Sequence, residues 1–326
     1  MKTSLLNLLL IALSLFLAIF LPFEVFLIAY AVLGPLHYIT EINWLKSKNY
    51  FTTNRYWVLV CLISSLFIVL PKLISLINKK FNAFEDLNNT LQVFNEYTNN
   101  FIFLLILIAL LPFIKGLKKH KIVLIVLCFL ASLFFKNSSF FTFIIGVLLI
   151  TLVHVYLFSI LFMIYGYKKK ASVLELLNII LVVCIPIIIF LVPIDYVNQV
   201  SKITYDSYIS SGFYILNAKI AGFLGYTNGN EFNFVNNHFV KVQIFITFAY
   251  LNHYFNWFAK TTQIKWHKLL SFKKVISIIS IWLVSVFLYW YDYKIGLTAL
   301  LFLSLLHVFL EFPLNIKTIK NLFSSL

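Results

Sequence analysis

The chain contains few charged residues, few glycines and prolines, and very little cysteine or arginine. Only 11% of its 326 residues are charged, against about a quarter in soluble domains. Hydrophobic residues make up 62% and the mean hydropathy is +0.95, which excludes an ordinary soluble domain. The apolar residues form runs of about 20, the length that crosses a bilayer as a helix. The sequence therefore predicts an all-α, polytopic integral membrane bundle.

The scarce residue types exclude further classes of protein. The three cysteines, Cys61, Cys128 and Cys184, stand singly in apolar runs, which predicts packing residues rather than disulfides or thiolate ligands. Arg55 is the only arginine, so bidentate recognition of phosphate is nearly unavailable and the net charge of +15 does not indicate nucleic acid. Kinase, P-loop, dinucleotide-binding and HExxH motifs are also missing.

Ten apolar segments predict about ten transmembrane helices in a single domain over residues 1–326. The first resembles a signal peptide but has no small-residue cleavage site, so we interpret it as a helix. Two polar segments, about 78–100 and 195–238, are predicted to be long loops on the outer face, with an amphipathic surface helix over Tyr208–Leu224. The predicted spans are approximately Ser4–Leu21, Phe23–Leu45, Tyr56–Ile77, Phe101–Ile114, Ile122–Phe135, Phe140–Tyr167, Val173–Ile194, Phe239–Phe258, Val275–Tyr291 and Gly296–Leu314.

The distribution of positive charge predicts the orientation of these spans. Most of the 26 Lys and Arg residues fall at the two termini and in alternate connections. By the positive-inside rule, both termini are expected in the cytoplasm. Scarce arginine together with abundant Lys, Asn, Ile and Phe is typical of AT-rich bacterial coding, which predicts a bacterial cytoplasmic (inner) membrane.

One short motif occurs twice inside the apolar segments. Its copies are Leu36–Glu41 (LHYITE) and Leu306–Glu311 (LHVFLE), and each places a histidine four residues before a glutamate. On a helix this spacing puts both side chains on one face. Ionisable groups in such apolar surroundings are costly and require partners. Pro35 and Pro313 lie beside the two copies, and helix irregularities next to intramembrane polar residues are typical of functional pockets.

Two more histidines fall within predicted spans. With the predicted orientation, His253 lies at the same cytoplasm-facing depth as both motifs, and His154 lies near the middle of its span. Imidazole and carboxylate ligands suit a divalent transition metal such as iron or zinc. We therefore predict a metal site made by His37, Glu41, His253, His307 and Glu311, with His154 as a sixth ligand. Supporting hydrogen bonds are expected from Tyr38, Thr40, Asn252 and Asn256.

Metal-free alternatives are also consistent with this pattern. The His–Glu pairs can satisfy each other by hydrogen bonding, and His154 can be a hydrogen-bonded packing residue. The same residues can also relay protons.

The layout of these histidines is similar to that of histidine-rich membrane oxygenases, namely the fatty-acid desaturases and hydroxylases and the membrane-bound β-carotene dioxygenases. The resemblance implies iron bound near the cytoplasmic ends of helices and a long apolar substrate. The HxxxH and HxxHH boxes of those families are absent here.

The leading hypothesis is a metal-dependent oxidoreductase acting on a lipid or isoprenoid from the cytoplasmic half of the membrane. The alternatives are a proton- or ion-coupled transporter or channel, and a non-catalytic membrane subunit that docks a partner through segment 195–238.

Overall fold

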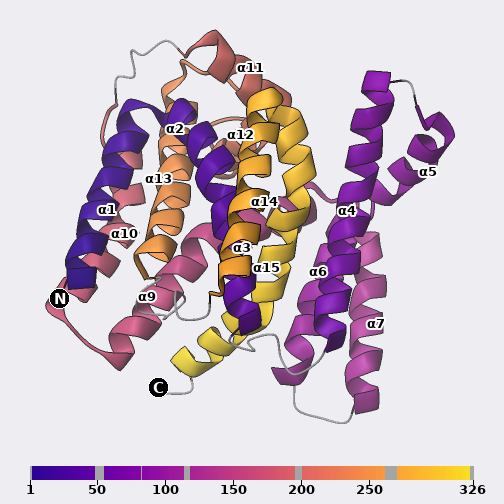
Figure 1. Cartoon of the computed structure of the whole chain (residues 1–326), viewed down its shortest axis with the longest axis horizontal. Coiled ribbons are helices and arrows are strands. Elements are labelled where there is room, and N and C mark those ends of the chain that lie inside the picture. The colour runs from indigo at the N-terminus through magenta and orange to yellow at the C-terminus, as the bar shows by residue number, and fades with distance from the viewer. Residues whose placement is uncertain are drawn as a thin grey trace. The chain divides into compact units, whose positions relative to one another are not determined.

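The computed structural model describes residues 2–47, 55–81, 83–113, 118–194, 200–260 and 270–323, which form helices and turns without a strand (Figure 1). The all-α prediction is thus confirmed. The chain divides into two compact units. The first unit is Met1–His37 with Leu152–Leu297, and the second unit is Tyr38–Thr151 with Thr298–Leu326. Three helical segments contribute to both units: α3 (Gly34–Ser47), the π-helical η3 (Thr142–Leu157) and α15 (Tyr293–Phe323).

The other described helices of the first unit come from both of its sequence ranges. Four of them have 19 to 24 residues, the length expected for membrane helices. They are α1 (Lys2–Phe20), α2 (Pro22–Ile28), the π-helical η1 (Ala29–Leu33), α9 (Phe158–Lys169), α10 (Val173–Leu191), α11 (Lys202–Ser211), α12 (Phe213–Phe223), α13 (Asn237–Lys260) and α14 (Phe272–Tyr291).

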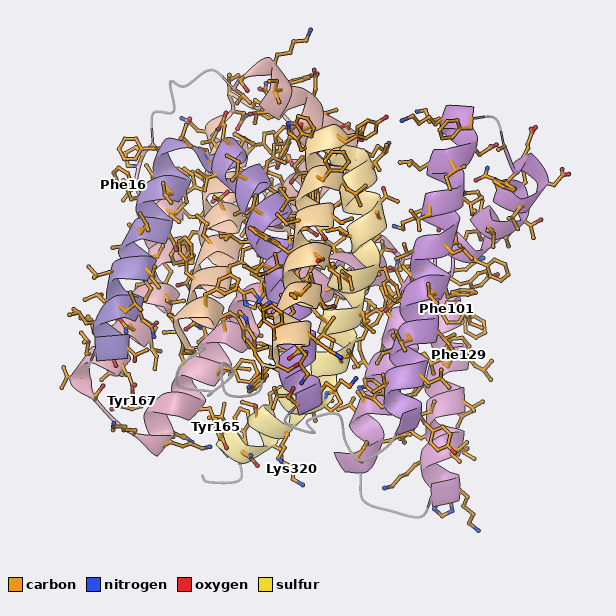
Figure 2. The ribbon with its side chains drawn as sticks, in the orientation of Figure 1. Phe16, Phe101, Phe129, Tyr165, Tyr167 and Lys320 are labelled. Carbon is orange, nitrogen blue, oxygen red and sulfur yellow. The ribbon has the colours of Figure 1, made fainter. Side chains whose placement is uncertain are left out.

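Helix α13 forms the centre of the first unit. It packs against α1, α2, α10 and α12, which flank it in Figure 1. Thirteen of its 24 residues are buried. By contrast, Phe16 on α1 points away from α13 and is exposed (Figure 2), as a side chain facing lipid would be. The first unit therefore surrounds one central helix with helices that present apolar outer faces.

A buried polar network joins α13 to the break between α1 and α2. The chain bends at Leu21, and Pro22 begins α2, a position where proline's missing N–H costs nothing. The Pro22 carbonyl accepts hydrogen bonds from Thr247 Oγ1 at 2.6 Å and Gln243 Nε2 at 3.3 Å. Tyr208 Oη donates to Gln243 Oε1 at 2.6 Å. These bonds satisfy polar atoms that would otherwise be buried without partners.

The second unit contains the other described helices. Phe101 on its α6 contacts Phe129 on α7, with ring centroids 6.4 Å apart (Figure 2). Asn100 Nδ2 donates to the Ser132 carbonyl at 2.8 Å, which ties the same two helices together. The helices are α4 (Arg55–Phe81), α5 (Glu85–Asn95), α6 (Thr98–Leu110), the 3₁₀ turn η2 (Leu111–Phe113), α7 (Lys118–Phe134) and α8 (Ser139–Phe141).

In the described residues, seven helices are long and apolar enough to cross a membrane, or eight if α5 and α6, bent by 54°, form one span. This confirms the prediction of a helical integral membrane protein. Three of the ten predicted spans lie outside the seven, and two of them, α7 and α13, also lie outside the eight. Helix α7 has only 17 residues, and α13 carries several polar side chains within its 24 residues. Ten spans and cytoplasmic termini therefore stay predictions.

The two polar segments predicted as long outer loops contain helices. Helix α4 continues to Phe81 and α5 follows within the first segment. In the second, Gly212 adopts a left-handed conformation, with φ of 80°, and separates α11 from α12. The single surface helix predicted over Tyr208–Leu224 is therefore two helices, because glycine readily ends a helix in this conformation. Helix α12 packs against α13 and buries one face, including Asn217.

Candidate metal centre

His37 follows a stretch of π-helix. Proline has no N–H to donate, and next to Pro35 the backbone changes register: the Gly34 N–H bonds to the Ala29 carbonyl, five residues back. The Trp282 indole donates to the Val32 carbonyl at 2.8 Å in this stretch. The His37 side chain is 1% exposed. Such π-helical turns are frequent at functional sites, and here the turn sets the rotation at which α3 presents His37.

His154 and Ser159 come from the chain where η3 passes into α9. His154 is buried in the π-helical segment, and Ser159 is buried in the first turn of α9. The Ser159 hydroxyl donates to the Val155 carbonyl one turn earlier, at 2.7 Å. This bond uses the only proton of the hydroxyl, so toward any other neighbour Ser159 Oγ acts as an acceptor.

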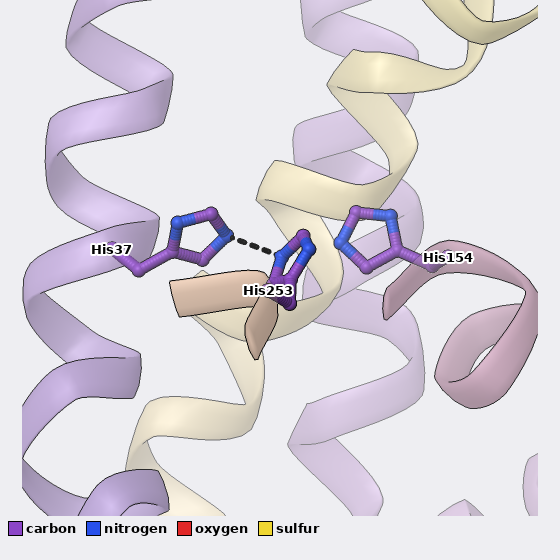
Figure 3. A group of neighbouring side chains, drawn as sticks. All are labelled: His37, His154 and His253. Carbon is purple, nitrogen blue, oxygen red and sulfur yellow. Dashed lines mark hydrogen bonds between the residues drawn. The ribbon is translucent and has the colours of Figure 1, made fainter. Parts of the chain in front are cut away.

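His253 on α13 lies between the other two histidines, as Figure 3 shows. Its Nε2 is 3.0 Å from His37 Nε2, and the two rings are nearly perpendicular. The His154 ring centroid is 5.3 Å from that of His253. All three histidines belong to the first unit. The structure thus brings together His37, His154 and His253, three of the six predicted ligands.

The Ser159 hydrogen bond fixes the tautomer of His253. Ser159 Oγ lies 2.9 Å from His253 Nδ1, and because its own proton is directed to the Val155 carbonyl, we infer that it accepts the Nδ1 proton. A neutral His253 then has a lone pair on Nε2, directed toward His37. Metal-binding histidines commonly donate their other ring N–H to such a partner, which orients the ring.

The three imidazoles can hold a divalent metal ion. One nitrogen from each lies within 4.8 Å of the others. Around a tetrahedral ion with metal–nitrogen bonds of about 2.0–2.1 Å, the nitrogens would be about 3.3 Å apart. The 3.0 Å separation of His37 and His253 is close to this value, so small side-chain rotations, chiefly of His154, would complete three-histidine coordination. Buried histidine groups able to hold a metal are thus present, as predicted.

Aromatic residues cover His37 within the first unit. The Tyr254 and Trp257 rings lie 5.4 Å and 5.5 Å from the His37 ring, centroid to centroid. Both residues are on α13, as is His253. The centre is therefore a polar group in apolar, aromatic surroundings, where electrostatic interactions are stronger than in water.

The other three predicted ligands lie in the second unit and form a cluster there. Glu41 and His307 offer ligand atoms within 4.8 Å of each other, and the Glu41 and Glu311 carboxyl groups share a hydrogen bond. Asn315 Nδ2 donates to Glu311 Oε2 at 3.2 Å. All of these residues are buried. The two copies of the motif therefore meet through α3 and α15.

The four residues predicted to support the ligands by hydrogen bonds are divided between the two units. Tyr38 stacks on His307 in the second unit, with ring centroids 4.3 Å apart and planes 23° apart, and Thr40 is buried on α3. Asn252 is buried on α13 and Asn256 is half-buried one turn later. Within the described parts of the chain, neither asparagine hydrogen-bonds a histidine of the centre.

Ser159 is the residue that sequence reasoning missed. Its only signal is that a small polar residue follows His154 in an otherwise apolar run. Serine is common in membrane helices, where it bonds the carbonyl one turn earlier, so this signal does not distinguish it from others.

No protein family, curated protein or solved structure matches this chain.

Proposed function

We propose that the protein is an integral membrane metalloenzyme whose metal ion is held by His37, His154 and His253. The observation that carries this proposal is the convergence of three imidazoles, two buried and one half-buried, the last of which is hydrogen-bonded to Ser159. Three protein ligands with a further position open are typical of catalytic rather than structural metal sites. The neutral, nitrogen-only ligand set suits iron, zinc or copper better than magnesium or calcium.

The reaction we propose is oxidation of a lipid or isoprenoid that enters from the membrane, with iron as the metal. Helices α1, α10 and α14 of the first unit expose apolar side chains, and Tyr254 and Trp257 place apolar surface next to His37. An apolar chain would contact these rings. When bound, the metal would supply the activation of dioxygen, and an external reductant would supply electrons. His253, held by Ser159, keeps the centre oriented.

Metal content tests the first part of the proposal. Wild-type protein purified in detergent without chelator should contain about one equivalent of iron or zinc per chain, measured by elemental mass spectrometry. His253→Ala should lose most of it, because it removes the ligand between the other two. His238→Ala is the matched control: His238 is also in the first unit but is exposed and stacks on Tyr226. Wild-type protein that stays metal-free after incubation with Fe²⁺ and Zn²⁺ contradicts the proposal.

Product analysis tests the second part. Iron-loaded protein in bacterial lipid vesicles, supplied with dioxygen and a reductant, should form hydroxylated or desaturated lipid detectable by mass spectrometry. Zinc-loaded protein is the control, since zinc has no redox chemistry. If the protein binds iron but forms no oxidised product under these conditions, the proposed metal site stands and the proposed oxidoreductase activity is wrong.

The topology we propose has ten spans, both termini in the cytoplasm, and a bacterial inner membrane as its location. Helix α13 is about 36 Å long at 1.5 Å per residue, enough to cross the hydrocarbon core. The 17 residues of α7 lie at the short end of the spanning range. Reporter fusions after Leu191 and at the C-terminus should report opposite sides of the membrane; the same side for both contradicts this topology.

Proton-coupled transport is the second candidate, and the carboxyl pair of the second unit favours it. A hydrogen bond between Glu41 and Glu311 requires a proton on one of them, and buried carboxyl groups in membranes commonly carry protons. Glu41→Gln would then abolish proton uptake by vesicles containing the protein. If the vesicles take up no protons in response to any imposed gradient, this candidate fails.

A further inference from the structure

A cavity of about 350 Å³ opens in the second unit, separate from both histidine groups. Its lining is divided by polarity. The polar members come from α4, the end of α5 and the start of α6. The apolar members lie one turn from the polar ones on α4 and α6, or come from η3 and α15. The polar side chains are Lys72, Asn95, Thr98 and Asn99, and the apolar ones are Ile68, Ile102, Ile150, Leu301 and Leu305.

Lys72 places a positive charge inside a membrane helix. It lies nine residues before Phe81, the end of α4, which is about 13 Å along the axis. The span Tyr56–Phe81 is otherwise strongly apolar. Within the described parts of the chain, no carboxylate forms an ion pair with Lys72. A cation at this depth requires an anionic partner or must extend its side chain to the interface.

The amide groups beside Lys72 are arranged around the same cavity. An alanine Cβ at Gly146 would overlap Asn99 Oδ1, so a side chain at this position would displace Asn99 from the wall. Asn99 Nδ2 donates to Thr142 Oγ1 at 3.2 Å. Asn95 Oδ1 is buried and has no hydrogen-bond partner among the described residues. The polar end of the cavity thus combines one ammonium group with amides and a hydroxyl.

We propose that this cavity binds the phosphate headgroup of an anionic phospholipid, with Lys72 as its counter-ion and an acyl chain along the apolar wall. Three features support an amphiphile: a cationic end, an apolar end one helical turn away, and an opening on a unit whose helices cross the membrane. The volume accommodates a headgroup and the start of a chain. This site does not depend on the proposed metal centre, since it belongs to another unit.

Lipid binding by the purified full-length protein tests the site. Native mass spectrometry would compare retention of phosphatidylglycerol, phosphatidylcholine and inorganic phosphate. Wild-type protein should retain phosphatidylglycerol selectively, and Lys72→Met should weaken its affinity about tenfold, as expected for loss of a charge-assisted hydrogen bond. Lys72→Arg should restore most of the affinity. Lys79→Met is the matched control, because Lys79 is an exposed lysine on the same helix that does not line the cavity.

Each other outcome counts against the proposal. Equal retention of phosphatidylcholine would mean that Lys72 merely extends to the interface. Equal loss in Lys79→Met would indicate general charge attraction. Displacement of the lipid by millimolar inorganic phosphate would assign the site to free phosphate. If Lys72→Met does not fold, Thr98→Val, which removes one hydroxyl at constant volume, must weaken phosphatidylglycerol binding for the proposal to stand.

Discussion

Replacing Ser159 with alanine tests how the proposed metal centre is oriented. In the wild type, His253 Nδ1 donates to Ser159 Oγ, so its Nε2 has a lone pair for a metal. Without the hydroxyl, His253 loses one of its two hydrogen-bond acceptors and keeps only the Val155 carbonyl. The proton is then less strongly held on Nδ1, and a larger share of the ring carries it on Nε2, where it bonds to His37 Nε2 at 3.0 Å. This tautomer removes the lone pair that the metal needs.

The expected loss in metal affinity follows from two separate estimates. Removing the hydrogen-bond partner of a metal-bound histidine typically lowers metal affinity about 10- to 100-fold, or about 1.4–2.7 kcal/mol. Removing a hydrogen-bond partner from a buried group costs about 1–3 kcal/mol, and the remaining Val155 carbonyl keeps the cost toward the lower end. The two estimates overlap, so we expect Ser159→Ala to bind zinc about 10- to 100-fold more weakly while still folding.

The assay is a competition titration of Zn²⁺ against a fluorescent chelator at constant pH. Ser285→Ala is the matched control: Ser285 is also buried in the first unit and also donates to the carbonyl one turn earlier, at 2.7 Å, but contacts no histidine of the centre. Unchanged zinc affinity in Ser159→Ala, or an equal loss in Ser285→Ala, would refute the reasoning about the tautomer.

Three further results are expected. Gly296→Ala should lower the thermal unfolding temperature in detergent, because its Cβ would lie 2.7 Å from backbone atoms of Tyr289, where neither backbone can yield easily. Gln243→Leu should destabilise the protein by about 1–3 kcal/mol in denaturant unfolding, since Tyr208 Oη loses its acceptor and the Pro22 carbonyl loses one donor. Acidification should release metal from the three-histidine centre, because a protonated imidazole cannot coordinate; metal content retained in acid would contradict histidine ligation.

The sequence predicted the class of fold and the kinds of residue in the site, but not all of their partners. Apolar runs indicated the helices because each must cross the same thickness of lipid. The two motifs predicted that His307, Glu41 and Glu311 would meet, and they do so in the second unit. That His154 would lie beside His37 and His253, and not beside the other three, could not be predicted, because periodicity shows which face of a helix a residue occupies but not which helix it faces.

Ser159 shows the same limit for a polar residue. Its bond to Val155 is local and predictable, but its bond to His253 joins residues 94 positions apart. Such a bond depends on how η3, α9 and α13 pack, and no spacing in the chain encodes that packing. Gly212 is a second example. Glycine can adopt a left-handed conformation, but whether it does so inside a predicted helix also depends on how the flanking helices, here α11 and α12, pack.

Helix α13, which we propose as a span, illustrates how a membrane helix can have low hydropathy. A helix facing lipid must be apolar on its outer surface, but a helix enclosed by other helices can carry polar groups if its neighbours supply their partners. Around α13 these partners are the Pro22 carbonyl and the Tyr208 hydroxyl at one end, and Ser159 and His37 nearer the other. Low hydropathy in α13 therefore reflects enclosure within the first unit rather than exposure to water. The same enclosure provides a site where three imidazoles, two of them buried, can approach one another.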